Sequence, residues 1–349
     1  MGIGIPAMWM RGGTSKALYF RREDLPNDIC SRDQLLLKIM GSPDKRQIDG
    51  VGGADPLMSK VAIISSSEDS AADVDYLFLQ VSVDKAEVSD SQGCGNVLAG
   101  VGPFAIERGL IRAGSPITNA RIRMCNTGEI AEVAISTPGG SVTYDGYETI
   151  DGVPGAAAAI PIFFSNLAGS NCGSLLPTGN FTDILDGVES TLIDNGMPCV
   201  ILKASDFGIT GQESRDQLEL NTEIKSAIES IRLQAGSLMK LGNVTKKSVP
   251  KMTLISEPLN GGALNTRSFI PHRAHSSIGV FAAITVATAC AIPDTVAASL
   301  AQVPYNGVYE IEHPSGCTKV QLELDDNGVI ERTGIIRTAR KLMDGTVYA

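Results

Sequence analysis

Two long apolar segments constrain the fold of this chain more than any other feature. Residues Asn96–Arg108 (NVLAGVGPFAIER) and Ser277–Ile292 (SIGVFAAITVATACAI) are apolar on most sides and rich in glycine and alanine. A helix that is apolar all round is buried all round, and small side chains let a surrounding sheet approach it closely. Each half of the chain is therefore predicted to be a curved sheet wrapped around one central helix.

The rest of the chain predicts short strands between turns rich in glycine, proline and aspartate. Alternation of polar and apolar residues in RIRM and QLEL indicates strands with one solvated face. The predicted strands are Lys60–Ser65, Tyr76–Val83, Arg121–Met124, Ala131–Ser136, Val200–Leu202, Met252–Ser256 and Val320–Leu324. Amphipathic helices are predicted at Ser31–Met40 and Ser214–Gly236.

Length and a faint internal repeat predict two domains. A chain of 349 residues is longer than one compact core usually serves. KVAIIS (Lys60–Ser65) is echoed by KMTLIS (Lys251–Ser256), and each precedes one of the apolar segments. We expect matched domains over residues 1–175 and 176–349, with terminal segments free to cross over between them.

Composition excludes several classes of partner and cofactor. The net charge of −10 argues against nucleic acid or an anionic membrane surface, and the longest apolar stretch is too short to span a bilayer. The seven cysteines form no CxxC pair, and the three histidines form no HxH or HxxxH pair. We therefore expect a reduced, cytoplasmic protein without a metal centre, and the first residues lack the pattern of a signal peptide.

The segment Arg11–Lys16 (RGGTSK) is a candidate anion-binding turn. Its glycines, Gly13 among them, allow backbone N–H groups to turn toward an anion. The side chains of Arg11, Thr14 and Ser15 add further donors. The order of residues differs from that of a Walker A loop, and a hairpin turn with solvated charges is the alternative.

Cys94 lies between Gly93 and Gly95, directly before the apolar segment that begins near Asn96. A thiol at the start of a helix meets a partial positive charge and unpaired N–H groups, which favour the thiolate. The N–H groups of Gly95 and Asn96 can also hold a substrate carboxylate or a developing enolate oxygen. A buried structural cysteine is the alternative, but such a residue seldom lies in a Gly-Cys-Gly turn.

Lys60 opens the apolar strand that follows the loop QIDGVGGAD (Gln47–Asp55). A lysine in this place can point its amine inward, and burial favours the neutral amine, which can act as a base. An exposed lysine at the end of a strand is the more common arrangement, and the local sequence by itself favours that alternative.

The segment Pro271–Ser277 (PHRAHSS) precedes the second apolar segment as Gly93–Asn96 precedes the first. Arg273 and Ser276, together with the start of the helix, can bind a second carboxylate. The alternative is that the polar residues of this segment are ordinary surface residues.

Three longer motifs resemble those of one protein family. They are MRGGTSKALYF, RQIDGVGGADPLMSKVAIIS and GCGNVLAGVGPFAIERGLI, and PKMTLI and PHRAHSSIGVFAA continue the similarity more loosely toward the C-terminus. On these motifs the chain is similar to the 2-methylaconitate cis-trans isomerase (PrpF) family. Within that family it looks most like the tautomerases of gallate and protocatechuate breakdown.

The resemblance implies a diaminopimelate epimerase-like α+β fold. Such a fold has two similar domains, each a curved, mostly antiparallel sheet around a central helix, with the site in the cleft between them. The family's paired lysine and cysteine fall on Lys60 and Cys94, and its glycine-rich anion-binding turn falls on Arg11–Lys16. Racemases and epimerases of this fold use two facing cysteines, whereas the second half of this chain has none at the corresponding position. Racemisation by two thiols is therefore not expected.

The resemblance implies a cofactor-independent isomerase that moves a proton on a small unsaturated di- or tricarboxylate. Isomerisation of 2-methylaconitate or of a methylitaconate-like acid is an alternative within the family. An amino-acid racemase or epimerase and a non-catalytic metabolite-binding protein are the alternatives from other classes. A homodimer is compatible with the sequence, which does not decide the oligomeric state.

Overall fold

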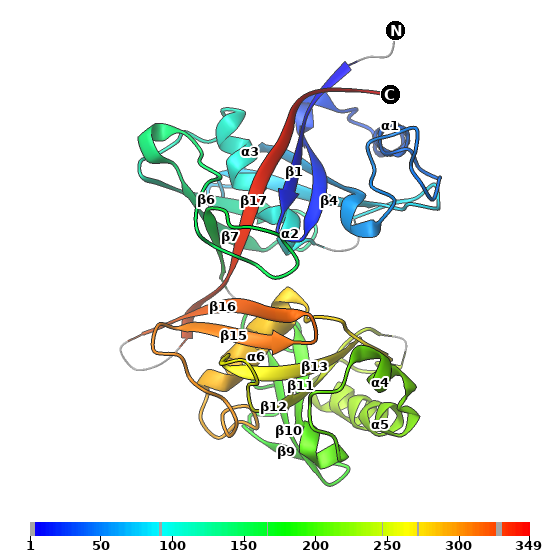
Figure 1. Cartoon of the computed structure of the whole chain (residues 1–349), viewed down its shortest axis with the longest axis vertical. Coiled ribbons are helices and arrows are strands. Elements are labelled where there is room, and N and C mark those ends of the chain that lie inside the picture. The colour runs from blue at the N-terminus through cyan, green and yellow to red at the C-terminus, as the bar shows by residue number, and fades with distance from the viewer. Residues whose placement is uncertain (1–3, 91–92, 166, 246, 271, 326–329) are drawn as a thin grey trace. The chain divides into compact units, whose positions relative to one another are not determined.

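The computed structural model describes residues 4–90, 93–165, 167–245, 247–270, 272–325 and 330–349. Pro271, the first residue of the motif PHRAHSSIGVFAA, lies outside the described residues. The chain divides into two compact units (Figure 1): unit 1 is Met1–Phe164 with Ile336–Ala349, and unit 2 is Ser165–Ile335. This division lies earlier in the chain than the expected one at 175. The C-terminal segment belongs to unit 1 because it forms strand pairs there.

Unit 1 is built on a ring of paired strands. They are β1 (Gly4–Gly12), β2 (Ser15–Arg21), β3 (Lys60–Ser66), β4 (Val74–Val81), β5 (Val88–Ser89), β6 (Ile117–Met124), β7 (Ile130–Ser136), β8 (Ala159–Phe164) and β17 (Ile330–Tyr348). The pairs run β17–β1–β2–β3–β4–β6–β7–β8, and β8 is paired with β17, which closes the ring. The pairs β2–β3 and β4–β6 are parallel. The pairs β17–β1, β1–β2, β3–β4, β6–β7 and β7–β8 are antiparallel.

The apolar segment of unit 1 is the central element of this ring, as its composition predicts. It forms α2 (Gly95–Leu98), which contacts β1 and β2, and α3 (Val101–Glu107), which contacts β3, β6 and β7. Tyr19 of β2 joins the ring to both helices. Its hydroxyl donates to Val97 O at 2.6 Å, and its ring lies 5.9 Å from that of Phe104.

The prediction of one continuous helix over Asn96–Arg108 is wrong, because the helix is interrupted at Ala99 and Gly100. Pro103, inside the segment, has no N–H to donate to the carbonyl of Ala99. The Gly100 N–H instead bonds to the carbonyl three residues earlier, at 3.0 Å. The helix that follows Cys94 is therefore one turn long, and a short helix exerts a weaker dipole effect on a thiol than the expected long one.

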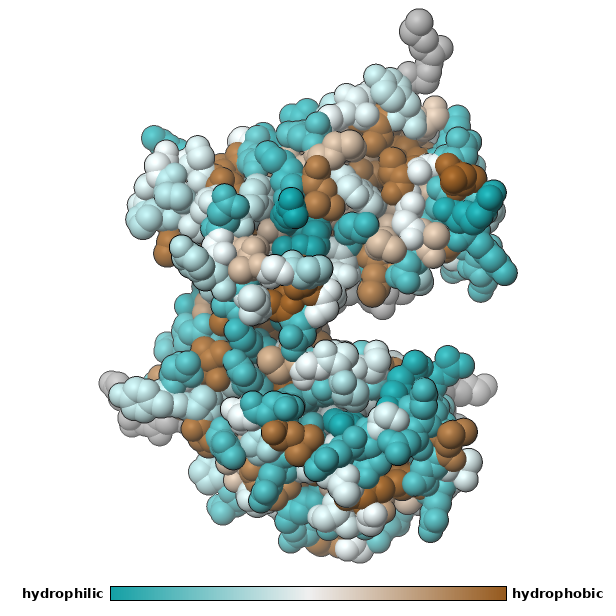
Figure 2. Space-filling model, in the orientation of Figure 1, coloured by the Kyte–Doolittle hydropathy of each residue, from teal (hydrophilic) through white to brown (hydrophobic). Residues whose placement is uncertain are grey.

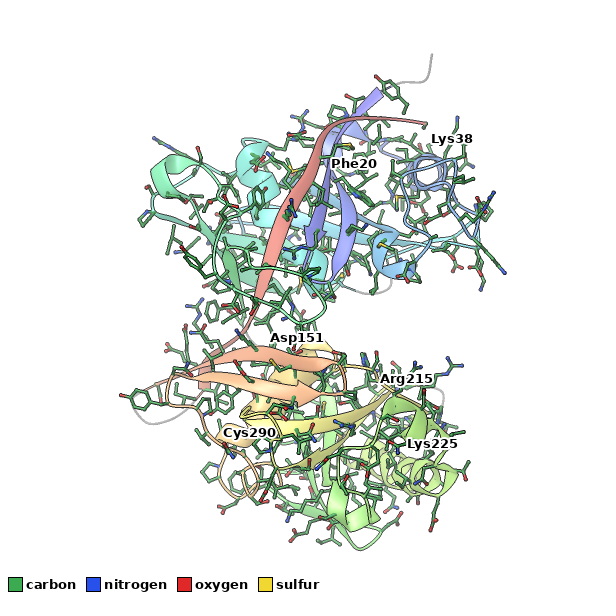
Figure 3. The ribbon with its side chains drawn as sticks, viewed as in Figure 1. Phe20, Lys38, Asp151, Arg215, Lys225 and Cys290 are labelled. Atoms are coloured by element: carbon green, nitrogen blue, oxygen red, sulfur yellow. The ribbon has the colours of Figure 1, made fainter. Side chains whose placement is uncertain are left out.

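The opposite face of β2, β3 and β4 packs against α1 (Ile29–Met40). The residues of this cluster include Leu18, Phe20, Leu36, Ile39, Met40, Val61, Ile63 and Leu79, and Phe20 is labelled in Figure 3. A strand that is buried on both faces consists of a nearly continuous apolar run, which explains the sequence KVAIIS. The predicted helix at Ser31–Met40 is confirmed, and Asp28 caps it by accepting from the Ser31 N–H at 2.8 Å.

Unit 2 repeats the topology of unit 1. Its strands are β9 (Asp183–Leu185), β10 (Val188–Asp194), β11 (Pro198–Lys203), β12 (Lys251–Ser256), β13 (Leu264–Ile270), β14 (Arg273–Ala274), β15 (Val308–His313), β16 (Gly316–Leu324) and the first part of β17. The parallel pairs β11–β12 and β13–β15 stand where β2–β3 and β4–β6 stand in unit 1. The repeated sequences KVAIIS and KMTLIS occupy the matching strands β3 and β12, so the predicted duplication is confirmed.

The helices of unit 2 occupy matching places as well. The predicted apolar helix is α6 (Val280–Ala291), which packs against β10, β11, β15 and β16. The prediction of one helix over Ser214–Gly236 is wrong: the segment forms α4 (Arg215–Leu220) and α5 (Thr222–Leu238). The break lies at Asn221, whose side chain accepts from the Ile224 N–H at 3.0 Å and caps α5.

The seven predicted strands are all present, with ends that differ by a few residues. Hydrophilic residues cover most of the face shown in Figure 2, with apolar residues interspersed. Within the described ranges, no helix has the length and apolar character that a membrane span requires.

We expect Tyr19→Phe to destabilise unit 1, because it removes the side-chain donor to the Val97 carbonyl, which then keeps only the Gly100 N–H. Loss of one hydrogen bond costs about 0.5–1.5 kcal/mol, which corresponds to a melting temperature lower by about 2–4 °C per kcal/mol. Tyr348→Phe is the matched control, since Tyr348 is 70% exposed. Thermal unfolding followed by circular dichroism measures both, and equal melting temperatures would contradict the role given to Tyr19.

Candidate active site

Lys60 is the first residue of β3 and is buried, with 7% of its surface exposed. It pairs with Ala17 of β2 and Gln80 of β4, so the three side chains lie in one row across the sheet. Its Nζ donates to Gln80 Oε1 at 2.9 Å and lies 4.9 Å from the centre of the Phe78 ring. No carboxylate in the described part of unit 1 forms an ion pair with this amine. Lys60 is thus the inward-pointing lysine, held by neutral partners.

Gln80 and the loop before β3 fix the position of this amine. Gln80 Nε2 donates to the carbonyls of Pro56 and Ser59 at 3.0 and 2.9 Å, which turns its Oε1 toward Lys60. Within the loop, the buried Gln47 donates to Ser59 Oγ at 2.8 Å. The motif QIDGVGGAD therefore supports the start of β3.

Cys94 is the residue directly before α2, and two buried tyrosines lie beside it. Tyr76 OH donates to the Cys94 carbonyl at 3.3 Å, and Tyr19 OH donates within α2. Burial raises the pKa of both phenols well above the usual range, and a negative charge on Cys94 raises it further. Both phenols therefore stay protonated next to the thiol and act as hydrogen-bond donors.

Cys94 also differs from the cysteines buried in unit 2. Burial raises the pKa of Cys172 and Cys290 to about 12, and Cys290 lies on α6 (Figure 3). Such thiols are inert, whereas Cys94 is partly exposed. Within the described residues, no group of three His, Cys, Asp or Glu side chains is placed to hold a metal ion.

The turn between β1 and β2 packs directly on the start of α2. Gly12 leaves no room for a side chain, because a Cβ there would lie 2.4 Å from Asn96 O. Gly13 has a φ of +52°, and a Cβ would lie 2.2 Å from Asn96 Oδ1. The Gly13 N–H, which we expected to face an anion, donates to Thr338 O of β17 at 2.9 Å. This amide is committed to the fold, and Gly13 allows the close approach of turn, helix and β17.

Side chains from three distant segments meet at this turn. Asn96 Nδ2 donates to Thr14 Oγ1 at 3.1 Å, and Arg337 Nε donates to Asn96 Oδ1 at 3.2 Å. Ser15 is 1% exposed, and its Oγ has no hydrogen-bond partner within the described structure. Because buried hydroxyls are normally hydrogen-bonded, the Ser15 hydroxyl is an unused donor at the turn.

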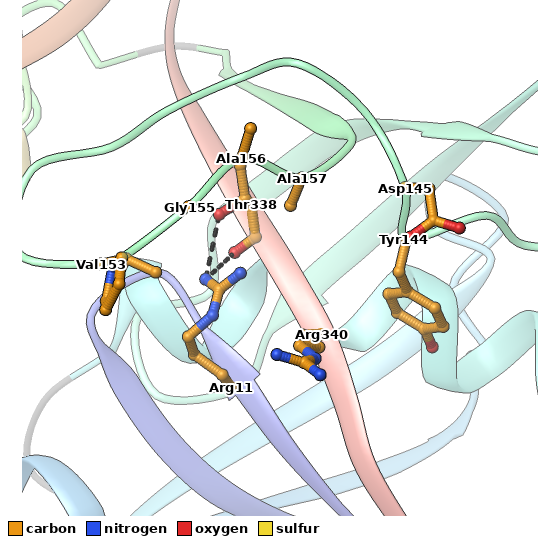
Figure 4. Close-up of a pocket in the computed structure, with 10 residues that line it drawn as sticks. Arg11, Tyr144, Asp145, Val153, Gly155, Ala156, Ala157, Thr338 and Arg340 are labelled. Carbon is orange, nitrogen blue, oxygen red and sulfur yellow. Dashed lines mark hydrogen bonds between the residues drawn. The ribbon is translucent and has the colours of Figure 1, made fainter.

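Arg11 lies on the outward face of β1, in a pocket of about 240 Å³ (Figure 4). Its Nη1 donates to Gly13 O at 2.9 Å and to both oxygens of Thr338 at 3.0 Å. Burial and the charge of Arg340, which lines the same pocket, lower the pKa of Arg11. These bonds brace the turn from outside, and anion binding by Arg11 stays a prediction.

Arg273 and Ser276 belong to unit 2, and both are exposed. Between them, His275 is partly buried, and its Nδ1 accepts from the Ser277 N–H at 2.8 Å. Burial and nearby positive charges, Lys251 among them, lower the pKa of His275. Its imidazole is therefore neutral at pH 7 and stabilises the turn before α6.

The predicted site residues of unit 1 thus share one region around the β1–β2 turn, the start of α2 and the first residue of β3. They are Gly13, Thr14, Ser15, Lys60, Cys94, Gly95 and Asn96. Sequence reasoning missed Gln80 and Arg337. Gln80 is detectable as the polar residue that interrupts YLFLQVSV, whereas Arg337 lies 241 positions from its partner Asn96 and has no local signal.

The sequence pattern of the family described as PrpF protein matches residues 2–349. The chain belongs to the PrpF family. The (4E)-oxalomesaconate Delta-isomerase of Novosphingobium sp. (strain KA1) is 60% identical over 345 residues, 98% of this chain and 97% of that protein. The 4-oxalomesaconate tautomerase of Pseudomonas putida is 55% identical over 345 residues, 98% of this chain and 95% of that one.

Solved structures confirm the fold of this PrpF protein. A structure of methylitaconate-delta-isomerase is similar with a TM-score of 0.91 and 34% identity, covering 100% of this chain and 96% of that one. A hydroxyproline epimerase from Agrobacterium vitis shares the fold at 12% identity, with a TM-score of 0.52 and coverage of 99% and 92%. The expected epimerase-like α+β fold is therefore correct.

We expect Gly12→Ala to destabilise the PrpF protein and to lower its activity, because the new Cβ meets the backbone of Asn96. Overpacking of this kind costs about 1–3 kcal/mol. Gly345→Ala in β17 is the control, since a Cβ there meets nothing within 4 Å. Melting temperatures and initial rates are the measurements. A Gly12→Ala variant as stable and active as the Gly345→Ala variant would show that the turn does not depend on this contact.

Proposed function

We propose that this PrpF protein is an isomerase of 4-oxalomesaconate. The observation that carries the proposal is its 60% and 55% identity to two proteins named for that substrate, over nearly their whole length. The chemistry is attributed to Lys60 and Cys94, because a buried amine and a partly exposed thiol lie in the same unit and both contact β4, Lys60 through Gln80 and Cys94 through Tyr76.

Lys60 is the general base of this proposal. The substrate carries an acidic C–H bond. Removal of its proton leaves a carbanion, which a conjugated carbonyl group stabilises. The amine of Lys60 takes this proton, and the electron pair of the C–H bond moves into a dienolate. A proton is then returned to the other end of the allyl system or to the enolate oxygen. Substrate and product are isomers, so no electrons and no atoms are exchanged with a second reactant.

Return of the proton has two routes, which differ in the residue that donates. Cys94 donates in the first, and its thiolate then recovers the proton that Lys60 holds. In the second, Lys60 returns the same proton, and Cys94 shapes the pocket. The routes differ in how much solvent deuterium enters the product. A proton that Lys60 removes and returns exchanges with water less completely than a proton that Cys94 donates.

The carboxylates of the substrate need donors that the fold leaves unused. Ser15 Oγ has no partner within the described residues, and Thr14 and Asn96 present polar side chains at the same turn. We assign these side chains and the Gly95 N–H to one carboxylate or to the dienolate oxygen. Arg273 and Ser276, both exposed in unit 2, stay candidates for binding a carboxylate, as predicted from the sequence.

Isomerisation of a methylitaconate-like acid is the second candidate, supported by the structural similarity to methylitaconate-delta-isomerase. Both candidates use the same proton transfer and differ in the groups around the double bond. An amino-acid racemase is disfavoured, since the residue before α6 that corresponds to Cys94 is Gly279. A binding protein without activity has no need of the Lys60–Gln80 arrangement.

We further propose a setting for this activity. The reaction needs no cofactor, because only a proton moves. The resemblance supports a role in the breakdown of aromatic acids such as gallate and protocatechuate. Free thiols at the surface, Cys30 and Cys125, fit a reducing, cytoplasmic location. A homodimer is the assembly to test by light scattering.

Lys60→Met should abolish the ultraviolet change that accompanies isomerisation of 4-oxalomesaconate. Loss of a general base costs about 10²–10⁴-fold in rate. Lys38→Met removes an exposed lysine on α1 (Figure 3) and should leave the rate unchanged. The assay is run with a chelator. No turnover by the wild type would exclude this substrate, and equal rates in all three proteins would exclude Lys60 as the base.

Alkylation should modify Cys94 and stop turnover, and bound substrate should protect this thiol. Peptide mass spectrometry separates Cys94 from the exposed Cys30 and Cys125, which should react with and without substrate.

Cys94→Ala in D2O decides between the two routes. If Cys94 is the donor, the rate falls by about 10²–10⁴-fold; a modest loss with unchanged deuterium content would assign both transfers to Lys60.

A further inference from the structure

Arg337 is a cation without an acidic partner at the site of unit 1. Its Nε donates to Asn96 Oδ1 at 3.2 Å and its Nη1 to Ile336 O at 3.0 Å. Among the residues that the structure describes, no carboxylate lies within ion-pair distance of Arg337, and its Nη2 has no hydrogen-bond partner. Burial lowers the pKa of Arg337 to about 10, so the group is charged at pH 7. Arg337 is half-buried, and because charges withdrawn from water are normally paired, a counter-ion from outside the chain is expected here.

The pairing of β17 shows which face of the ring Arg337 occupies. Successive side chains of a strand point to opposite faces. Ala339 pairs with Gly12, whose Cα faces α2, and Arg337 lies on that face two residues earlier. Arg340 pairs with Arg11 and faces the outer pocket (Figure 4). One strand therefore presents one arginine to the site and another to the opposite face.

Ser15 supplies a second unpartnered group on the inner face. It pairs with Gly12 across β1 and β2, which places Ser15, Gly12 and Ala339 in one row. Its hydroxyl is buried and has no partner in the described chain. A guanidinium and a hydroxyl without protein acceptors thus lie on the same face of three neighbouring strands. A carboxylate has the charge and the two acceptor atoms to satisfy both.

We propose that Arg337 binds a carboxylate of the substrate and that the Ser15 hydroxyl donates to the same group. The identity of the ligand as 4-oxalomesaconate rests on the proposed function, whereas the carboxylate chemistry rests on Arg337 and Ser15. Asn96 holds the guanidinium by its Nε, which leaves Nη2 for the ligand. A guanidinium matches the planar geometry of a carboxylate better than an ammonium group does.

The test uses tricarballylate, a saturated tricarboxylate that cannot isomerise, beside kinetics with 4-oxalomesaconate. Calorimetric binding is measured for wild type, Arg337→Gln, Arg337→Lys, Ser15→Ala and the control Arg340→Gln. Arg337→Gln should weaken tricarballylate binding and raise KM by about 10- to 100-fold, with a smaller change in kcat. Arg337→Lys should recover part of the affinity, Ser15→Ala should lose several-fold, and Arg340→Gln should stay within about two-fold of the wild type.

The outcomes separate this inference from the proposed function. If the wild type isomerises 4-oxalomesaconate and Arg337→Gln matches it in affinity and KM, the carboxylate site is overturned and the function stands. If the wild type does not isomerise the substrate but binds tricarballylate through Arg337, the function is overturned and the site stands. Equal losses in Arg337→Gln and Arg340→Gln indicate a general effect of charge and overturn the site. Should Arg337→Gln not fold, Arg337→Lys carries the test, since wild-type affinity in that variant contradicts the proposed geometry.

Discussion

The antiparallel pairing of β1 with β17 is the interaction on which the candidate site depends. It joins residues from the two ends of the chain along nearly the whole of β1, from Gly4 opposite Tyr348 to Gly12 opposite Ala339. The Gly13 N–H and the Arg11 guanidinium both bond to Thr338, so the β1–β2 turn has its shape only when β17 is in place. The same strand brings Arg337 to Asn96. Loss of this pairing would remove the support of the turn and one of its charges together.

Among the residues that the structure describes, fully buried side-chain nitrogen and oxygen atoms have hydrogen-bond partners, except for Ser15 Oγ at the turn. Arg232 of α5 is fully buried, yet it pairs with Glu229 and donates to three backbone carbonyls. Arg337 has no such acid within the described residues, and Ser15 Oγ has no partner there. Burial of an unsatisfied polar group destabilises the folded state. Such groups persist at one place in unit 1, beside the thiol and the amine, where a ligand completes their hydrogen bonds.

Sequence reasoning succeeded where local properties decide the structure. Apolar composition predicted the central helices, and short apolar runs predicted the strands, because burial follows from the residues themselves. The prediction of continuous helices failed at Gly100 and Asn221. There, Pro103 and the Asn221 cap override the apolar or amphipathic pattern. These breaks had signals in the sequence, since proline and asparagine mark helix ends.

The site was predicted in part for the same reason. The motifs around Ser15, Lys60 and Cys94 are local, and their backbones meet as expected. The choice between Arg11 and Arg337 depends on the alternation of faces in two strands that pair across the whole chain. No window of sequence contains that information, because register between distant strands is set by tertiary packing.

The ring of unit 1 also has a consequence for protein synthesis. A ribosome releases β1 first and β17 last, so β1 (GIPAMWMRG) is an open edge strand for almost the whole time of translation. All residues of unit 2, which ends at Ile335, are synthesised before unit 1 is complete. N-terminal domains usually fold first. Here that order is reversed, because the ring of unit 1 is completed last. An apolar edge that waits for its partner strand is a site of aggregation, so unit 1 is exposed to this risk until β17 has been synthesised.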